Sequence, residues 1–316
     1  MMITPAKAVS PRDVTNKSLW KRITVNYEMY LFLLPAIVYY IIFKYGPLYG
    51  LQIAFKDFNG ALGFWGSKWV GLKYFNSFFS SYYFWPLLKN TLVLSVYSLI
   101  AGFPIPIILA LMLNEVKNYK YKKFVQTVTY APHFISTVVL VGTIVIVLSP
   151  TYGIVNQMLR LLGMEVQSFM TNPGLFRHIY VWSGIWQNTG WDAIIYLAAL
   201  SAVDPEQHEA AIIDGASRIQ RIWYINIPVL IPIMTILLIL NAGNIMNIGF
   251  EKVLLMQNDL IMDVADVIST YVYRRGLLQA EFSFSAAIGL FNNAANFILL
   301  MIVNGITRKF GETSLF

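Results

Sequence analysis

Amide and aromatic side chains recur at helical spacing within strongly apolar stretches of the chain. Asn188, Asp192 and Tyr196 stand four residues apart, and Gln187 and Trp191 fall on the adjacent face of the same expected helix. Amides both donate and accept hydrogen bonds, and aromatic rings stack on the C–H faces of ring-shaped polyols. This combination predicts a cavity that contacts a polyhydroxylated molecule.

Asparagines form two further stripes. The first recurs every three residues and the second shares one face of an expected helix: Asn241, Asn244 and Asn247; Asn292, Asn293 and Asn296. A simpler alternative stays open for all three stripes, because such amides also join helices through hydrogen bonds worth about 0.6 kcal/mol each. Asp192 is expected to be paired or to face a cavity, since a carboxylate in lipid costs a few kcal/mol.

Membrane-spanning helices are the elements that position these residues. Hydrophobic residues make up 57% of the 316 positions and charged residues 12%, against about 25% charged in soluble domains. A span needs about 20 mostly apolar residues. The stretches that qualify are 29–54, 87–113, 124–148, 178–202, 227–250 and 283–306. The sequence therefore predicts an all-α membrane protein with six transmembrane helices, the first of which kinks or ends near Gly46-Pro47.

Basic residues concentrate in every second connection. Thirteen of the 23 Lys and Arg residues fall in 1–28, 114–123, 203–226 and 307–316. Because short cytoplasmic segments are enriched in Lys and Arg, both termini are expected in the cytoplasm. The expected organisation is a cytoplasmic N-terminal segment (1–28), one transmembrane domain (29–306) and a cytoplasmic tail (307–316). The outer segments 55–86 and 251–282 are long enough for short helices.

The cytoplasmic loop 203–228 has the residues of a rigid helix pair rather than of a loose connector. Asp204 is a favourable N-cap, Pro205 suits the first helical position, and Gln207 is placed for a capping box. This first helix is predicted to run from Pro205 to about Ile213.

A fixed corner and a second helix should follow. Gly215 permits a turn directly after the first helix, since glycine tolerates positive φ. Ser217 and Gln220 form a second capping box, and Pro228 is expected to end the second helix and to start the next span. A rigid pair of helices joined to a span can carry the movement of a docked partner into the membrane.

The same loop resembles the EAA signature of ABC-importer permeases that depend on a binding protein. EAAIIDGAS is followed by IPVLIP at the start of the next span. The residues at motif spacing are Glu209, Ala210, Ala211, Asp214, Gly215 and Ala216. The resemblance implies that they form a coupling helix that docks on an ATPase subunit. The alternative is an amphipathic helical loop that lies on the membrane.

Four further stretches resemble the branch of this family that imports complex oligosaccharides, the relatives of alginate and rhamnogalacturonan permeases. They are WVGLKYF (69–75), YAPHFIS (130–136), YLAALSAVDP (196–205) and MDVADVISTYVYRRGL (262–277). The resemblance implies the six-helix type I permease fold in a bacterial cytoplasmic membrane. It also implies a heterodimer with a second permease, two ATPase subunits that bind ATP and magnesium, and an extracytoplasmic solute-binding protein. The implied substrate is an oligosaccharide, with uronate-containing chains such as alginate among those expected.

Several other chemistries are excluded or disfavoured. No GxxxxGK[ST] phosphate-binding loop occurs, so energy must come from another chain or from an ion gradient. An ion-coupled secondary carrier stays the alternative, with Asp192 as its single candidate carboxylate and no visible inverted repeat. The chain has no cysteine and three scattered histidines, so no metal site, bound cofactor or catalytic residue is expected. Topology explains the net charge of +7 better than nucleic-acid binding does.

Overall fold

The computed structural model describes residues 27–310, which fall into two units divided after Gln52. The predicted segment 1–28 and tail 307–316 lie largely outside the described residues. The first unit holds α2 (Tyr27–Tyr40), the π-helical turn η2 (Ile41–Tyr45) and most of the 3-10 helix η3 (Gly46–Phe55). The helix changes type near Gly46-Pro47 but does not end there. The reason is that Pro47 has no N–H to continue the α-helical hydrogen bonds.

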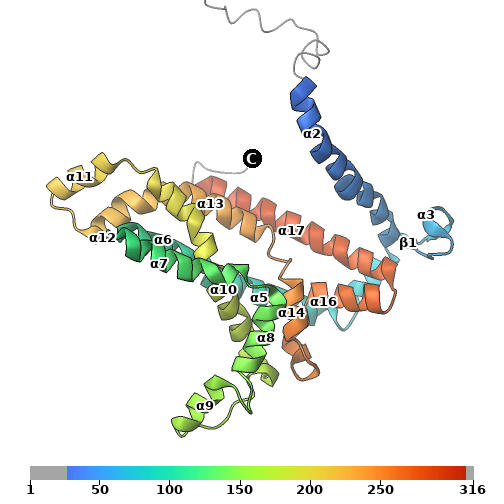
Figure 1. Ribbon diagram of the computed structural model, residues 1–316. Coiled ribbons are helices and arrows are strands. Elements are labelled where there is room, and N and C mark those ends of the chain that lie inside the picture. Colours follow the sequence, from blue (N-terminus) through green and yellow to red (C-terminus); the bar gives the residue numbers. More distant parts are fainter. Residues whose placement is uncertain (1–26, 311–316) are drawn as a thin grey trace, which may run out of the picture. The chain divides into compact units, whose positions relative to one another are not determined.

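The second unit is helical apart from a two-residue antiparallel ladder (Figure 1). Its first half contains β1 (Lys56–Asp57), α3 (Gly63–Gly66), β2 (Lys68–Trp69), α4 (Lys73–Phe79), α5 (Phe84–Gly102), α6 (Pro104–Glu115), α7 (Tyr119–Tyr130), η4 (Ala131–Phe134) and α8 (Thr137–Val147). Then follow α9 (Ile154–Leu161), η5 (Phe169–Thr171), α10 (Pro173–Ser201), α11 (Pro205–Ile213), α12 (Arg218–Arg221), η6 (Ile222–Asn226) and α13 (Ile227–Ala242). The last elements are α14 (Phe250–Met256), η7 (Asp259–Ile261), α15 (Met262–Ala265), α16 (Ile268–Tyr273), η8 (Arg274–Leu278) and α17 (Phe282–Phe310).

Within residues 27–310, four continuous helices are long and apolar enough to cross a membrane: Tyr27–Phe55, Phe84–Glu115, Arg218–Ala242 and Phe282–Lys309. A bent pair, Tyr119–Phe134 with Thr137–Val147, makes a fifth if it counts as one span. Helix α10 has 29 residues and is therefore also long enough, but its polar side chains lower its hydropathy. The short helices expected in 55–86 and 251–282 are present.

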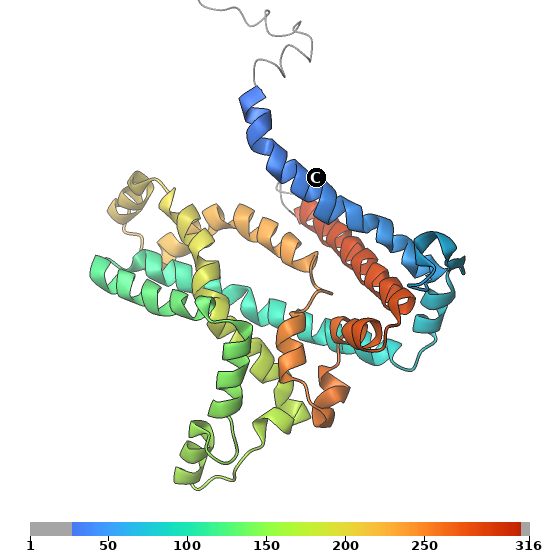
Figure 2. The same ribbon diagram turned by 45° about the vertical axis from the view of Figure 1, so that its right-hand side comes forward.

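The expectation of an uninterrupted helix over 124–148 is wrong. Its two halves meet at 100°, and α8 leaves α7 at the bend (Figures 1 and 2). Pro132 interrupts the backbone hydrogen bonds of the first half. Ser136 then starts a new helix, because its hydroxyl accepts a hydrogen bond from the Val139 amide. The local sequence therefore determines the position of the break.

The fifth expected span, 227–250, begins earlier and ends earlier than predicted. One helix runs from Arg218 to Ala242 without a break at Pro228. The π-helical turn η6 precedes this proline, and its wider i→i+5 bonding accommodates a residue that lacks an N–H. At the other end Gly243 caps the helix, so Asn244 and Asn247 lie in the following turn and loop.

Three clusters of buried side chains hold the second unit together. The first joins α5, α8, α10 and α14, the second joins α4, α5, α16 and α17, and the third joins α6, α10 and α13. Helix α10 contributes to the first and third clusters. It is therefore fixed along its length, with one face left for the polar side chains described below.

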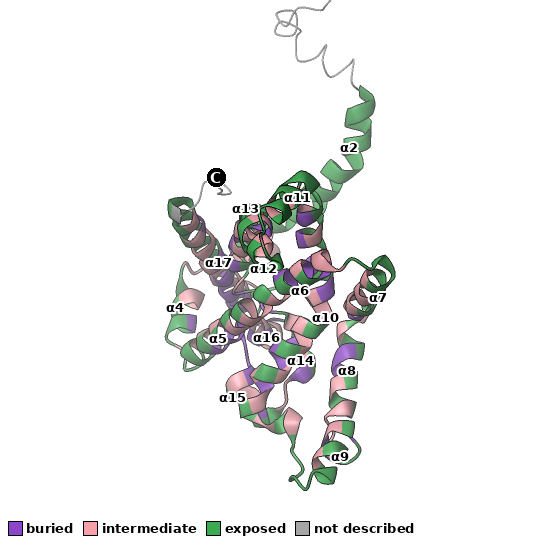
Figure 3. Cartoon of the chain, turned by 90° about the vertical axis from the view of Figure 1, so that its left-hand side faces the viewer, coloured by how far each residue is buried: buried purple, intermediate pink, exposed green. Residues whose placement is uncertain are grey.

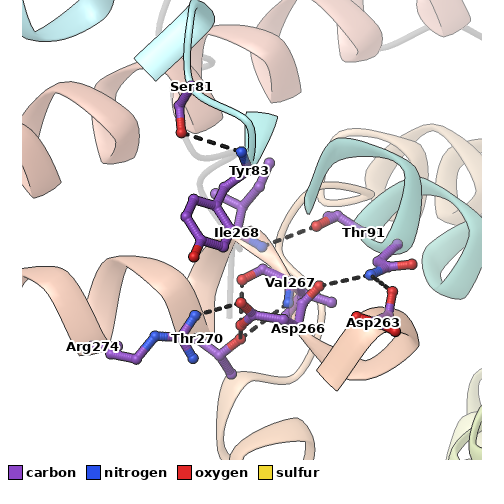
Figure 4. Close-up of polar contacts among 10 residues, drawn as sticks. Ser81, Tyr83, Thr91, Asp263, Asp266, Val267, Ile268, Thr270 and Arg274 are labelled. Atoms are coloured by element: carbon purple, nitrogen blue, oxygen red, sulfur yellow. Dashed lines mark hydrogen bonds and ion pairs between the residues drawn. The ribbon is translucent and has the colours of Figure 1, made fainter. Parts of the chain in front are cut away.

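Buried polar contacts fasten the segment between α13 and α17 to α5 (Figure 4). The Asn90 amide donates to the carbonyl oxygens of Asp263, at 2.8 Å, and Asp266, at 3.1 Å. The Thr91 hydroxyl accepts from the Ile268 amide at 3.1 Å. Each contact satisfies a backbone group at the end of a short helix, which burial would otherwise penalise. The segment between α13 and α17 is thus a fixed part of the fold rather than a loose connection.

Candidate functional site

The polar face of α10 lines a cavity of about 840 Å³ in the second unit. All five candidate residues of this helix contribute to its wall: Gln187, Asn188, Trp191, Asp192 and Tyr196. They share a surface because residues three and four positions apart lie on one side of an α-helix. The wall thus combines amides, aromatic rings and one carboxylate.

The opposite part of the wall comes from the end of α13 and the loop after it. Asn241, Asn244 and Asn247 all line the same cavity. They do so although the last two are not helical, because the chain turns after Gly243 and keeps these side chains beside α10. The Asn244 amide donates to the Leu240 carbonyl at 3.1 Å, which fixes its position.

His133, for which the sequence indicates no role, lies at this site. Its Nδ1 is 3.0 Å from Asn188 Oδ1, and its ring stacks on Trp191 with centroids 4.5 Å apart and an angle of 4°. The neighbouring Gln187 donates to the Ile135 carbonyl at 2.8 Å. The bend between α7 and α8 therefore orients the amides of α10. The signal in the sequence is a proline and a capping serine on either side of His133 inside an apolar stretch.

The asparagines of α17 have other surroundings. The Asn292 amide donates to Asn247 Oδ1 at 2.7 Å, and Asn296 Oδ1 accepts from the Met246 amide at 2.8 Å. Both are buried, whereas Asn293 is exposed. None of the three is among the residues that line the cavity within the described chain. Their contacts match the helix-joining alternative, since they tie α17 to the loop that carries Asn247.

The loop 203–228 forms the first helix and the corner that its sequence predicts, but its second helix continues through Pro228 into the next span instead of ending there. Helix α11 begins at Pro205 and ends at Ile213, and the Asp204 carboxylate accepts from the Glu206 amide at 3.0 Å. Gly215 adopts a φ of +82°, which a residue with a Cβ would reach only with strain. Ser217 and Gln220 form the reciprocal capping box at the start of α12. The corner is therefore rigid.

Most residues around this corner are exposed (Figure 3), and several of them are apolar. The exposed fractions are 85% for Ile213, 77% for Ile219 and 63% for Trp223. No residue of α11 is buried. Glu209 and Ala210, four and three residues before Ile213 in α11, are also exposed. An exposed apolar surface with a charged residue in it is typical of a site that a protein partner covers.

One ion pair links the corner to the transmembrane helices. The Arg221 guanidinium lies 3.9 Å from the Glu115 carboxylate at the end of α6, and both side chains are mostly buried. Helix α6 packs along α10 through the third cluster, which includes Ala110 and Ala193. The corner and the cavity wall therefore belong to one continuous packed structure.

Residues 102–310 match the family model for the binding-protein-dependent transport system inner membrane component. The chain belongs to this family. The match covers the bend, the corner and the cavity wall except for Ser95, Ser98 and Leu99 of α5. This permease is thus a membrane component of a transport system, with several apolar helices long enough to span the bilayer, and not an enzyme. The ion-coupled carrier is no longer a competing interpretation.

Relatives of this permease resemble it over nearly its whole length. It is 42% identical to protein LplB of Bacillus subtilis over 315 residues, 100% of this chain and 96% of the relative. It is 43% identical to the polygalacturonan/rhamnogalacturonan transport system permease protein YteP of the same organism, over 96% of this chain and 95% of YteP.

Solved structures resemble it equally closely. One is a crystal structure of a bacterial alginate ABC transporter in complex with an alginate pentasaccharide-bound periplasmic protein. The TM-score is 0.87 at 41% identity, over 94% of this chain and 99% of that chain. A second, of a bacterial ABC transporter involved in the import of alginate, gives a TM-score of 0.85 at 42% identity. The permease therefore has the fold of an ABC-importer membrane subunit.

Proposed function

We propose that this permease and a second, different permease form the pathway by which an acidic oligosaccharide crosses a bacterial cytoplasmic membrane. The cavity between α10 and the end of α13 carries this proposal. Its volume, about 840 Å³, is in the range of sites that hold drug-sized ligands. Its amides offer hydrogen-bond donors and acceptors to hydroxyls, and they attract an anionic sugar less strongly than a ring of cations would. A ligand held in this way can also leave.

The driving force in this proposal is ATP hydrolysis on two separate ATPase subunits, which also bind the magnesium. The exposed apolar corner between α11 and α12 is the docking surface for one of these ATPase subunits. Its contact residues are Glu209, Ala210, Ala211, Asp214, Gly215 and Ala216. An extracytoplasmic solute-binding protein delivers the sugar at the other side. The nature of the sugar follows the names of the relatives, which transport polygalacturonan, rhamnogalacturonan or alginate.

The topology that fits this proposal has six crossings and both termini in the cytoplasm. The crossings are 27–55, 84–115, the bent 119–147, 173–201, 218–242 and 282–309. Lys117 lies between the second and third crossings, and Lys120, Lys122 and Lys123 lie in the first two turns of the third. The positive-inside preference places this end in the cytoplasm. The bent crossing starts at the cytoplasmic surface with the basic helix α7.

Purification followed by reconstitution tests the proposal. A tagged permease taken from its native membranes in mild detergent should bring with it one second permease and two copies of an ATPase. Proteoliposomes of that complex, supplied with the binding protein and radiolabelled trigalacturonate, should accumulate the sugar only when ATP is present on the ATPase side. A permease that purifies alone, or uptake that does not depend on ATP, contradicts the proposal.

A further inference from the structure

Lys252, the third residue of α14, is a lysine in a buried position. Its side chain is 8% exposed, its Nζ donates to the Tyr180 carbonyl at 2.8 Å, and the ammonium lies 4.7 Å from the centre of the Tyr180 ring. Gly184 makes room for it, since a Cβ there would lie 3.2 Å from Nζ. The position of the ammonium is therefore well defined.

No carboxylate of the described chain neutralises this ammonium. The ion pairs within residues 27–310 are Asp57–Lys73, Glu115–Arg221, Asp266–Arg274 and Glu281–Arg275. A buried charge without a counterion costs free energy that folding has to supply. Burial lowers the pKa of Lys252 to about 8, so most molecules still carry the charge at neutral pH. An ammonium has three donors, and the Tyr180 carbonyl takes one.

Lys252 also lines the cavity proposed above as the sugar pathway. It is the single basic residue among those that line this cavity in the described part of the chain. Gly184, beside the ammonium, lies four residues from Asn188, a distance of about 6 Å along the axis of α10. A ligand whose hydroxyls contact Asn188 therefore places its neighbouring groups near the ammonium.

The other charged residues of the wall, Asp192 and Glu251, are acidic. They repel a carboxylate, so the wall attracts an anionic group at one position and disfavours it elsewhere. Because Lys252 has no acidic partner, an arriving carboxylate breaks no ion pair when it binds. The contact also stays reversible, since the Tyr180 carbonyl and ring hold the ammonium after the ligand has left.

We infer that Lys252 is the residue of the pathway that recognises the carboxylate of a uronic acid unit, an inference that rests on the proposed function. It assigns the preference for acidic sugars to one side chain. The surrounding amides then bind hydroxyls, which acidic and neutral sugars share. Lys252 thus selects acidic sugars, and other residues of the same wall make the contacts along which any sugar passes.

Uptake of radiolabelled trigalacturonate by the complete importer in proteoliposomes tests this inference. Lys252→Met keeps the length and the apolar stem of the side chain but removes its charge, and Lys252→Arg keeps the charge. We expect the Met variant to take up the sugar about tenfold more slowly, as is usual when a charge-assisted hydrogen bond is lost, and the Arg variant to retain more than a third of the wild-type rate. Lys89→Met, which removes an exposed lysine of α5 outside the cavity, should change nothing.

The melting temperature of each purified complex separates recognition from packing. If Lys252 recognises substrate, the Met variant melts no lower than the wild type, because it loses a buried charge without a partner. A Met variant that transports within twofold of the wild type overturns the inference, and so does one whose loss of uptake is matched by a lower melting temperature. A wild-type complex that takes up no trigalacturonate overturns the proposed function itself, whatever the variants do.

Discussion

Gly190 brings two helices of this permease into backbone contact. A Cβ at this position would lie 2.1 Å from the Thr129 carbonyl oxygen and 2.9 Å from the Tyr130 ring. Since a backbone atom cannot turn away as a side chain can, Gly190→Ala should force α10 away from the end of α7. We expect a loss of about 3 kcal/mol or more in stability, seen as a lower melting temperature of the purified protein.

Gly142 provides the matched control for Gly190→Ala. It is also helical, but a Cβ there would meet nothing within 4 Å. Gly142→Ala should therefore leave the melting temperature unchanged or raise it slightly, because alanine is the better helix former. Equal effects of the two substitutions would show that the close approach of α7 and α10 does not hold in the membrane.

Asn292 and Asn296 test which role the asparagines of α17 have. Replacing both by Leu removes the hydrogen bond to Asn247 and leaves the buried Met246 amide without its acceptor. Each buried group left unpaired costs about 1–3 kcal/mol, so we expect a complex that dissociates more readily in detergent. Asn293→Leu, at the exposed neighbouring position, should have no such effect. A double variant that stays assembled but transports slowly would instead return these residues to the pathway.

At the scale of elements, the corner between α11 and α12 depends on the backbone of Gly215. Gly215→Pro excludes the observed φ of +82° and removes the amide that donates to the Ile212 carbonyl at 3.0 Å. The permease should still insert into the membrane. Sugar-stimulated ATP hydrolysis by the assembled importer should fall more than tenfold, because the docking surface loses its shape.

The chain offers a close control for this substitution. Gly163, after α9, has a φ of +72°, and its amide donates to the Arg160 carbonyl at 3.0 Å. Gly163→Pro therefore causes the same local damage in the loop after α9, which the proposed topology places on the opposite side of the membrane from the corner. If it reduces ATP hydrolysis as much as Gly215→Pro does, the loss reflects misfolding and the coupling function assigned to the corner is wrong.

The sequence predicts the elements of this permease best where the determinants are local. Asp204, Gly215 and the Ser217–Gln220 pair specify α11, the corner and α12 through contacts within a few residues. The bend at Pro132 and Ser136 has equally local causes. Because the stretches on both sides of it are apolar, however, hydropathy alone predicts one straight span there. The end of α13 is harder to predict, since the Met246 amide that follows it is satisfied by Asn296, fifty residues later.

The sequence pattern does not predict contacts between elements that are distant along the chain. The stacking of His133 on Trp191 and the position of Lys252 against Tyr180 depend on how α7, α10 and α14 pack. Helical spacing indicates which residues of one helix share a face. It does not indicate which face of another helix they meet, and so it leaves cavity and helix contact as equal alternatives.

At the scale of the whole molecule, the orientation in the membrane can be tested directly. The chain has no cysteine, so a single introduced thiol reports one position. A cysteine at Lys120 should react with an impermeant maleimide only from the cytoplasmic side, and one at Asp259 only from outside, as the distribution of basic residues predicts. Labelling from the opposite sides would reverse the topology and would move the corner away from the ATPase subunits.

The helix from Arg218 to Ala242 gives this permease a lever. It contains 25 residues, which corresponds to about 37 Å at 1.5 Å per residue. The corner lies at one end and Asn241, in the cavity wall, at the other. A tilt of about 10° at the corner moves the far end by about 6 Å, more than one helical turn. The helix is not interrupted at Pro228. If the proposed function is correct, a small movement of a docked ATPase would therefore be magnified into a displacement large enough to open or close the path of a sugar ring.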